Sequence, residues 1–358
     1  MIALNKSIPF FSRARKYRVR TILIIAIFWT LIDLTMIFAT DFAHLSDPLN
    51  NLLLRESFVF VMSLGMGYLF VFTLKTIFRN YPFVINFLLK SFILLLAAFL
   101  LNFLVHLVEN LSLEGQSFKT AAHAFIYESI NSQWLFQKTI YWLALFIVTQ
   151  LFIEINDKYS PGVFIDIILG KYTTPKVENR IVMFIDLKDS TPIAEKMGHQ
   201  QYFLFIREFI YDISLALIEQ DGRIYQYVGD EIVVSWLNTR KNIKEALMAV
   251  VRSRKNIQKK TQYYRRHYGM VPEFRVGIHV GEVTVGEIGV IKKDLAMSGD
   301  TMNTTARIRS ACNELNQHFI VSAEFIRQSD LSEFQSESLG KIDLKGKTED
   351  IELFALKI

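Results

Sequence analysis

The sequence contains very little cysteine: Cys312 is the single cysteine in 358 residues. One thiol excludes an intramolecular disulfide and any metal site that is built from several cysteines. The chain is therefore compatible with a reducing cytosol. The net charge is also small, +5 at pH 7, so we expect no nucleic-acid partner.

Long apolar runs are missing from the second half of the chain and are concentrated in the first 155 residues. A hydrophobic content of 51% is too high for a purely soluble protein of this length. We therefore predict an N-terminal membrane domain, residues 1–155, with four transmembrane α-helices. The predicted spans are residues 21–39, 57–74, 83–108 and 134–155.

Basic residues gather on one side of the predicted membrane domain. The first 20 residues carry six Lys or Arg residues, and the second loop carries Lys75 and Arg79. The other two loops hold only Arg55 and Lys119 beside several acids. The positive-inside rule places the N-terminus and the second half of the chain in the cytoplasm. A cleaved signal peptide is the alternative for the first run, but its apolar core would be shorter.

Three ionisable residues, Asp33, His106 and Lys138, lie a few residues from the outer ends of their spans. Charges within a membrane are costly and are often functional. One interpretation is a shallow polar site that binds an unknown ligand. The alternative is that Lys138 extends to the headgroups and Asp33 pairs locally. A deeper residue, Lys90, has no partner that the sequence identifies.

Residues 156–177 change character abruptly, because Pro161-Gly162 and Pro175 flank a short apolar stretch. Their position between the two halves predicts a coupling linker, although a passive tether fits equally well. Residues 178–358 then alternate between strand and helix periods. This order predicts an α+β domain with a β-α-β-hairpin core, as in ferredoxin-like folds. The predicted elements are a strand ending at 186, a helix at 192–219, a hairpin at 225–236, a helix at 242–267, strands at 274–280, 283–287 and 295–297, a helix at 300–313 and closing strands.

Two carboxylates stand where β-rich runs end. The apolar run 181–185 stops at Asp186, and the hairpin turns at Gly229-Asp230. The turn also has a purely structural explanation, since Gly supplies a positive φ and Asp bonds the local backbone. Two such carboxylates nevertheless suit Mg²⁺, which prefers one or two carboxylates together with phosphate oxygens. The pair therefore predicts a nucleoside triphosphate as the remaining ligand.

Three distant segments, read together, resemble the catalytic domains of class III adenylate/guanylate cyclases. They are FIDLKDST at 184–191, YVGDE at 227–231 and SGDTMNTTARI at 298–308. Three motifs in family order and spacing are specific where any one alone is weak. The resemblance covers residue 180 to the C-terminus and is to the bacterial type with a membrane domain in front. It implies an enzyme of the inner membrane that forms 3′,5′-cyclic nucleotide and pyrophosphate.

The resemblance also implies roles for individual residues. Asp186 and Asp230 match the family's metal-binding aspartates, with two Mg²⁺ or Mn²⁺ ions per site. Asn303 and Arg307 match its transition-state pair, and their i, i+4 spacing places them on one helix face. Alternatively, Arg307 is a surface cation beside Arg309. Because the family takes these pairs from different subunits, a homodimer with two shared sites is implied.

The expected phosphate contacts come from two segments. Backbone N–H groups at a turn from strand into helix form an anion site, here around Lys188, Asp189, Ser190 and Thr191. Near the C-terminus, Lys345 resembles the family lysine that reaches the triphosphate, with Lys347 as the alternative. Either lysine could instead be a solvated charge in a turn.

The sequence departs from the family at the base pocket. Gln226 stands where adenylate cyclases commonly place lysine, and Ala296 where they place aspartate or threonine. The glutamate and cysteine of guanylate cyclases are also absent. Gln can read adenine, guanine or a pyrimidine edge, because it both donates and accepts hydrogen bonds. We expect ATP, with GTP or a pyrimidine triphosphate, or a catalytically silent signalling module, as alternatives.

Overall fold

The chain folds into two compact units that divide near residue 158. The computed structural model describes residues 13–40, 49–74, 77, 81–108, 110–111, 115–131, 134–156, 163–291, 294–329, 334–342 and 350–358. Each unit has its own cluster of buried apolar side chains. The two units are therefore described separately.

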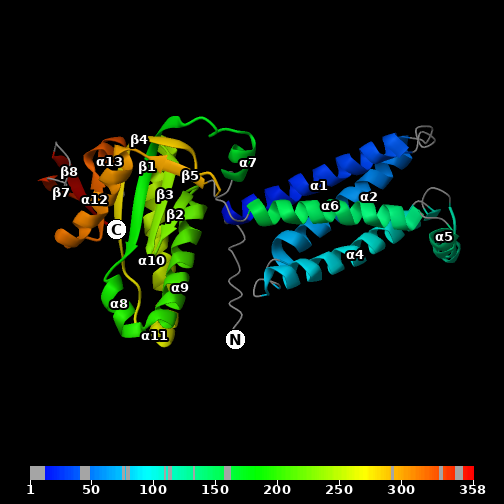
Figure 1. The fold of residues 1–358 in the computed structure, drawn as a ribbon, viewed down its shortest axis with the longest axis horizontal. Helices are drawn as coiled ribbons and strands as arrows, with labels where there is room; N and C mark the ends of the chain where they lie inside the picture. The colour runs from blue at the N-terminus through cyan, green and yellow to red at the C-terminus, as the bar shows by residue number, and fades with distance from the viewer. Residues whose placement is uncertain are drawn as a thin grey trace. The chain divides into compact units, whose positions relative to one another are not determined.

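The first unit is a bundle of long helices (Figure 1). Four segments are long and apolar enough to cross a membrane, which confirms the four apolar helices expected from the sequence. A further short helix, α5, lies between the last two and was not predicted. The elements are α1 (Arg13–Thr40), α2 (Leu49–Tyr68), the π-helix η2 (Leu69–Leu74), α4 (Phe83–Val108), α5 (Phe118–Asn131) and α6 (Trp134–Asn156).

Aromatic packing and two polar contacts hold the bundle together. The Trp29 ring lies 4.6 Å from the ring of Phe146, centroid to centroid. Trp29 Nε1 donates a hydrogen bond of 2.9 Å to Thr149 Oγ1, so the polar edge of the buried indole is satisfied. Lys90, which lacked a partner at the sequence level, donates from Nζ to Glu154 Oε1 at 2.8 Å.

The ionisable residues near the outer ends of the spans fall into separate contacts. Asp33 Oδ2 lies 3.8 Å from Arg55 Nη2. Arg55 lies within α2 and not in a loop, where the sequence had led us to expect it. Lys138 acts electrostatically on the same Asp33 carboxylate, whereas His106 Nδ1 lies 3.9 Å from Glu128 in α5. These contacts favour local pairing of Asp33 over a single site formed by all three residues.

The second unit is an α+β domain built around one mixed sheet, which confirms the predicted fold class. The strand order is β2-β3-β1-β4-β6-β8-β7, and β5 pairs with β4. β4 and β6 are parallel, whereas the other described pairs are antiparallel. The strands are β1 (Lys176–Leu187), β2 (Arg223–Val228), β3 (Glu231–Leu237), β4 (Phe274–Ile288), β5 (Asp294–Ser298), β6 (Phe319–Ser322), β7 (Gln335–Ile342) and β8 (Ile351–Lys357).

The helices of this unit differ in detail from the prediction. The helix expected at 192–219 breaks at Gly198, where φ is +73°, and the helix expected at 242–267 is also two helices. The two strands expected between 274 and 287 form one strand, because β1 pairs along most of β4. The helices are α7 (Val163–Ile168), α8 (Ser190–Met197), α9 (His199–Glu219), α10 (Arg240–Lys259), α11 (Thr261–Tyr268), α12 (Asp300–Glu314) and α13 (Ala323–Gln328).

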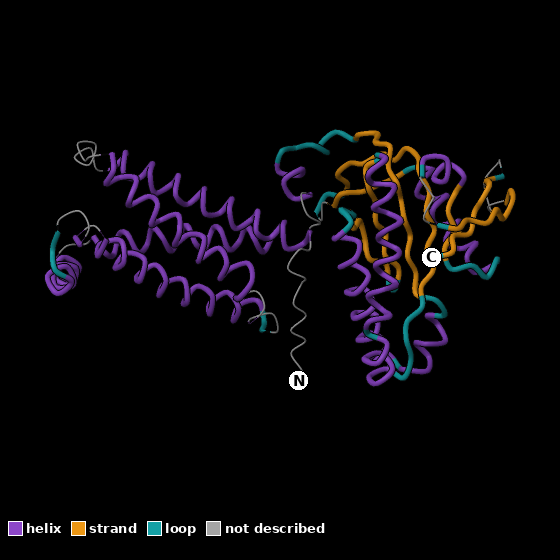
Figure 2. Tube along the Cα trace, turned by 180° about the vertical axis from the view of Figure 1, so that it is seen from behind, coloured by secondary structure: helices purple, strands orange, loops and turns teal. Residues whose placement is uncertain are grey.

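Alternation along β1 separates two faces of the sheet. Ile181 and Met183 belong to the main core, which also includes side chains of α9 and α10. Figure 2 shows the long helices of this unit in purple beside the strands of the sheet in orange. Val182 and Phe184 point to the opposite face, where residues of α12 pack. Asp186 continues this second set. Its carboxylate is therefore directed to the face that α12 partly covers.

Helix α12 lies unusually close to β4. A Cβ atom added at Gly277 would lie 2.5 Å from the backbone nitrogen of Arg309 and 2.8 Å from its Cα. A Cβ at Gly281 would lie 2.5 Å from Thr301 Oγ1. The two glycines therefore allow α12 to rest directly on β4 at Thr301 and Arg309.

We predict that Gly277→Ala lowers the free energy of unfolding of the second unit by about 1–3 kcal/mol, because the helix backbone must move away from the strand. Thermal melting of the purified chain measures this change. In Gly65→Ala, the control, the added Cβ meets nothing within 4 Å. Equal melting temperatures for Gly277→Ala and the natural protein would contradict the close contact.

Candidate active site

Three carboxylates converge at neighbouring strand ends. Asp186 is on β1, Asp230 is in the turn between β2 and β3, and Glu231 begins β3. Ile185 pairs with Ile232 in the antiparallel ladder, so the next residues, Asp186 and Glu231, also lie opposite one another. Asp186 and Asp230 are close enough for a hydrogen bond between their side chains. The structure thus brings together the two carboxylates that the sequence singled out.

The Asp186 carboxylate is costly to ionise in this position. Burial raises its pKa to about 6; the Arg309 guanidinium opposes this rise, and the charges of Asp230 and Glu231 add to it. Burial also raises the pKa of Glu231, again against Arg309. Additional positive charge at this place would therefore stabilise the cluster.

One buried oxygen of the cluster lacks a donor. Asp230 Oδ2 is buried and accepts no hydrogen bond in the part of the chain that the structure describes. An unsatisfied carboxylate oxygen beside a second carboxylate fits a hard cation such as Mg²⁺ or Mn²⁺. No group of three or more His, Cys, Asp and Glu residues forms a complete metal site among the described residues. The remaining ligands of such a cation would be water molecules, backbone carbonyl groups or oxygens of a bound molecule.

Arg309 of α12 is a residue of the carboxylate cluster that sequence reasoning missed. Its Nη1 lies 3.2 Å from Asp186 Oδ2, and its Nη2 lies 2.8 Å from Glu231 Oε2. The signal was present in the spacing: a residue two positions after Arg307 is rotated by about 200° around a helix. Arg309 therefore faces the carboxylates of its own chain.

Asn303 and Arg307 lie on the other side of α12. Asn303 is exposed and Arg307 is partly exposed. Neither side chain makes a hydrogen bond or an ion pair within the described residues. The structure keeps the two together, as their spacing predicted, but it does not turn them toward Asp186 of the same chain. Their functional groups remain available to another molecule.

In the turn after Asp186, the backbone N–H and the side chain of Lys188 already contact another part of the chain. Lys188 donates its backbone N–H to the carbonyl of Glu273 at 2.9 Å, and its Nζ lies 2.8 Å from Glu273 Oε2. A phosphate contact from Lys188 would therefore require this pair to open. Asp189, which has a left-handed backbone with φ of +57°, precedes Ser190 and Thr191 at the start of α8. Two further predicted phosphate ligands, Lys345 and Lys347, lie outside the described residues.

The two expected base-pocket residues come from neighbouring strands. Met297 of β5 donates its backbone N–H to the hydroxyl of Tyr225 on β2 at 3.0 Å. These residues are next to Ala296 and Gln226, so the contact brings the two expected positions into one region. The ladder between β2 and β3 shifts register at Tyr225, and such bulges redirect side chains beside active sites. Gln226 is exposed.

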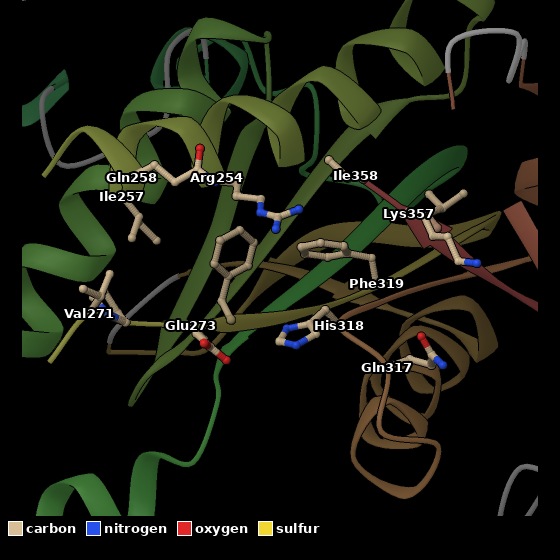
Figure 3. A pocket seen from close by; sticks show the side chains of 13 residues that line it. Arg254, Ile257, Gln258, Val271, Glu273, Gln317, His318, Phe319, Lys357 and Ile358 are labelled. Carbon is tan, nitrogen blue, oxygen red and sulfur yellow. The ribbon is translucent and has the colours of Figure 1, made fainter. Parts of the chain in front are cut away.

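A separate cavity of about 700 Å³ lies away from these residues. In Figure 3, Arg254 of α10 points toward the same space as His318 and Phe319. Asp186 and Asp230 do not line the cavity, although Glu273, the partner of Lys188, does. This cavity is therefore not the place where the carboxylates meet.

Comparison with known proteins identifies the second unit. Residues 173–357, just over half of the chain, match the family model described as the adenylate and guanylate cyclase catalytic domain. The matched segment contains every described residue of the candidate site.

Individual relatives agree with this match. Adenylate cyclase 2 of Rhizobium meliloti (strain 1021) is 30% identical over 206 residues, 57% of this chain and 57% of that protein. The adenylate cyclase of Anabaena cylindrica is 26% identical over 219 residues, 56% of this chain and 42% of that protein. The chain thus spans about half the length of these curated relatives.

A solved structure supports the fold alone. It is the structure of a bacterial light-regulated adenylyl cyclase, with a TM-score of 0.53 and 15% identity. The similarity covers 64% of this chain and 67% of that chain.

Proposed function

Because the chain belongs to the adenylate and guanylate cyclase catalytic domain family, we propose that it converts a nucleoside triphosphate, ATP in the first instance, into a 3′,5′-cyclic monophosphate and pyrophosphate. The observation that carries the proposal is the meeting of Asp186 and Asp230, with a buried oxygen that lacks a donor. ATP is chosen because the two relatives described above are adenylate cyclases. Gln226 is compatible with other bases.

In the proposed reaction the ribose 3′-oxygen forms a bond to the α-phosphorus and loses its proton to solvent. The bond from this phosphorus to the bridging oxygen breaks, and pyrophosphate leaves with the electron pair. Asp186 and Asp230 would hold two divalent cations, which activate the 3′-oxygen and neutralise charge on the leaving group. The N–H groups of Ser190 and Thr191 at the start of α8 would bind phosphate oxygens.

Arg307 and Asn303 would act on the part of the substrate that changes charge. The Arg307 guanidinium donates two parallel hydrogen bonds to phosphoryl oxygens as negative charge moves during the reaction. The Asn303 amide orients the ribose. Lys345, or alternatively Lys347, would contact the triphosphate.

The direct test incubates the purified full chain with Mn²⁺ and ATP, GTP, CTP or UTP in turn. We expect cyclic product, and we expect Asp186→Asn and Arg307→Ala each to lower kcat by about 100-fold or more, since each removes a group that acts in the transition state. Arg265→Ala, which removes an exposed cation of α11, is the control and should be fully active. No product from any triphosphate would support a silent signalling module instead.

We further propose that two copies of the chain share their active sites. The support is the geometry of α12: Arg309 faces the carboxylates of its own chain, whereas Asn303 and Arg307 face away from them. A site that needs all four residues therefore requires α12 of a second copy. Symmetry then creates two equivalent sites.

Mixed dimers test this sharing. Asp186→Asn and Arg307→Ala, each inactive alone, should regain about one quarter of the natural activity when co-expressed in equal amounts, because half of the dimers then contain one intact site of two. Two forms of Asp186→Asn, separately tagged and co-expressed, should regain nothing. Absence of recovery in the first mixture would mean that each chain completes its own site.

We also propose that the four apolar helices anchor the chain in the inner membrane with the second unit in the cytoplasm. The support is the distribution of basic residues along the sequence. Triphosphates do not cross bilayers, so inside-out vesicles should form product from added ATP and right-side-out vesicles should not. Detergent should equalise the two preparations. Product from intact right-side-out vesicles would reverse the orientation.

The short helix α7, within the expected linker, is the candidate coupling element. Asp166 Oδ2 lies 2.9 Å from Arg223 Nη1 on β2, the strand that leads to Asp230, and 3.5 Å from Lys171 Nζ. We expect Asp166→Asn to change the activity severalfold without changing the amount of protein. Asp221→Asn, which loses an exposed pair with Lys241, is the matched control. Unchanged activity in Asp166→Asn would favour a passive tether.

A further inference from the structure

We propose that Arg309 is a built-in counter-ion of the metal site, which a divalent cation must displace from Asp186 in order to bind. This inference rests on the proposed function, because it requires Asp186 to be a metal ligand. It goes beyond that function by making the entry of the metal depend on the presence of substrate.

The contacts of Arg309 carry the inference. One guanidinium spans two carboxylates from adjacent strands, at 3.2 Å from Asp186 and 2.8 Å from Glu231. The three side chains are only 23%, 17% and 15% exposed, so solvent screens their attraction less than at an open surface. A cation in this place neutralises the oxygens that a metal ion would use.

The backbone of Arg309 also has little freedom to retreat. It lies directly on Gly277 of β4, at a distance that leaves no room for a Cβ atom. The side chain therefore remains within reach of the site when a metal ion arrives. Glu231, whose Oε2 lies 2.8 Å from Arg309 Nη2, can retain the guanidinium after the contact with Asp186 opens.

The other nearby arginine does not duplicate this role. Arg275 stands opposite Asp186 in the β1–β4 ladder, and its Nη1 lies 3.9 Å from Asp189 Oδ1. The Arg275 guanidinium thus interacts with the turn that precedes α8. Arg309 is the arginine that bridges the carboxylates themselves.

Competition between Arg309 and a metal ion has a clear consequence. Without nucleotide, the ion gains the carboxylates of Asp186 and Asp230 but must displace a positive charge. With nucleotide, the triphosphate adds negative ligands that favour the ion over the guanidinium. The two ligands therefore strengthen each other's binding, as linkage requires.

The experiment measures Mn²⁺ binding to the full chain in detergent, without nucleotide, from the electron paramagnetic resonance signal of free Mn²⁺. We expect Arg309→Gln to bind Mn²⁺ about tenfold more tightly than the natural protein, since a nearby positive charge is removed. Arg309→Lys keeps the charge and should stay close to the natural affinity. Loss of a merely structural residue would not tighten binding. An ATP analogue that cannot cyclise should reduce the difference between the variants.

Asp186→Asn separates failure of this inference from failure of the proposed function. If Asp186→Asn binds Mn²⁺ as the natural protein does, the metal site itself is wrong. If Asp186→Asn loses binding while Arg309→Gln binds no more tightly than the natural protein, only the counter-ion role is overturned. Melting curves confirm that each variant is folded, and Arg309→Met, which keeps an apolar stem, replaces Arg309→Gln if the latter is not.

Discussion

Mutual repulsion among the carboxylates at the end of β1 and the start of β3 is the constraint on which the catalytic unit depends. Asp186 and Glu231 are held together beside Asp230 although burial raises the pKa of both Asp186 and Glu231. The sheet supplies the restraint, because β1 is paired on both sides, with β3 and with β4. A site assembled at such a cost is suited to binding cations, since a bound cation removes the repulsion that the fold has to withstand.

The same sheet also positions the helix that serves the site. β4 pairs with β1 and carries Gly277 and Gly281, on which α12 rests. Strand, glycines and helix thus form one continuous connection from the carboxylates to Asn303 and Arg307. In the apolar bundle, the buried ammonium group of Lys90 is paired with the Glu154 carboxylate. This is what a lipid environment demands of a helical bundle.

The sequence was sufficient for the parts that depend on local pattern. Asp186 and Asp230 stand out because each ends a β-rich run, and Asn303 and Arg307 because helical spacing joins them. Partners distant in the chain were not predictable in this way. Arg309 is 123 residues from Asp186, and Glu273 is 85 residues from Lys188. Only the packing of α12 on β4 and the pairing of β1 with β4 bring these groups together. The break at Gly198 was missed because the apolar periodicity continues across it.

The opposed directions of Arg307 and Arg309 have a consequence for kinetics. In a pair of chains assembled as proposed, α12 carries Arg309 on one face for the active site of its own chain. Its other face carries Arg307 for the active site of the second chain. A small tilt of α12 would change the geometry of both active sites at the same time. Turnover at the two active sites would then be coupled: substrate binding or product release at one site would alter the rate at the other without any change in the sheet.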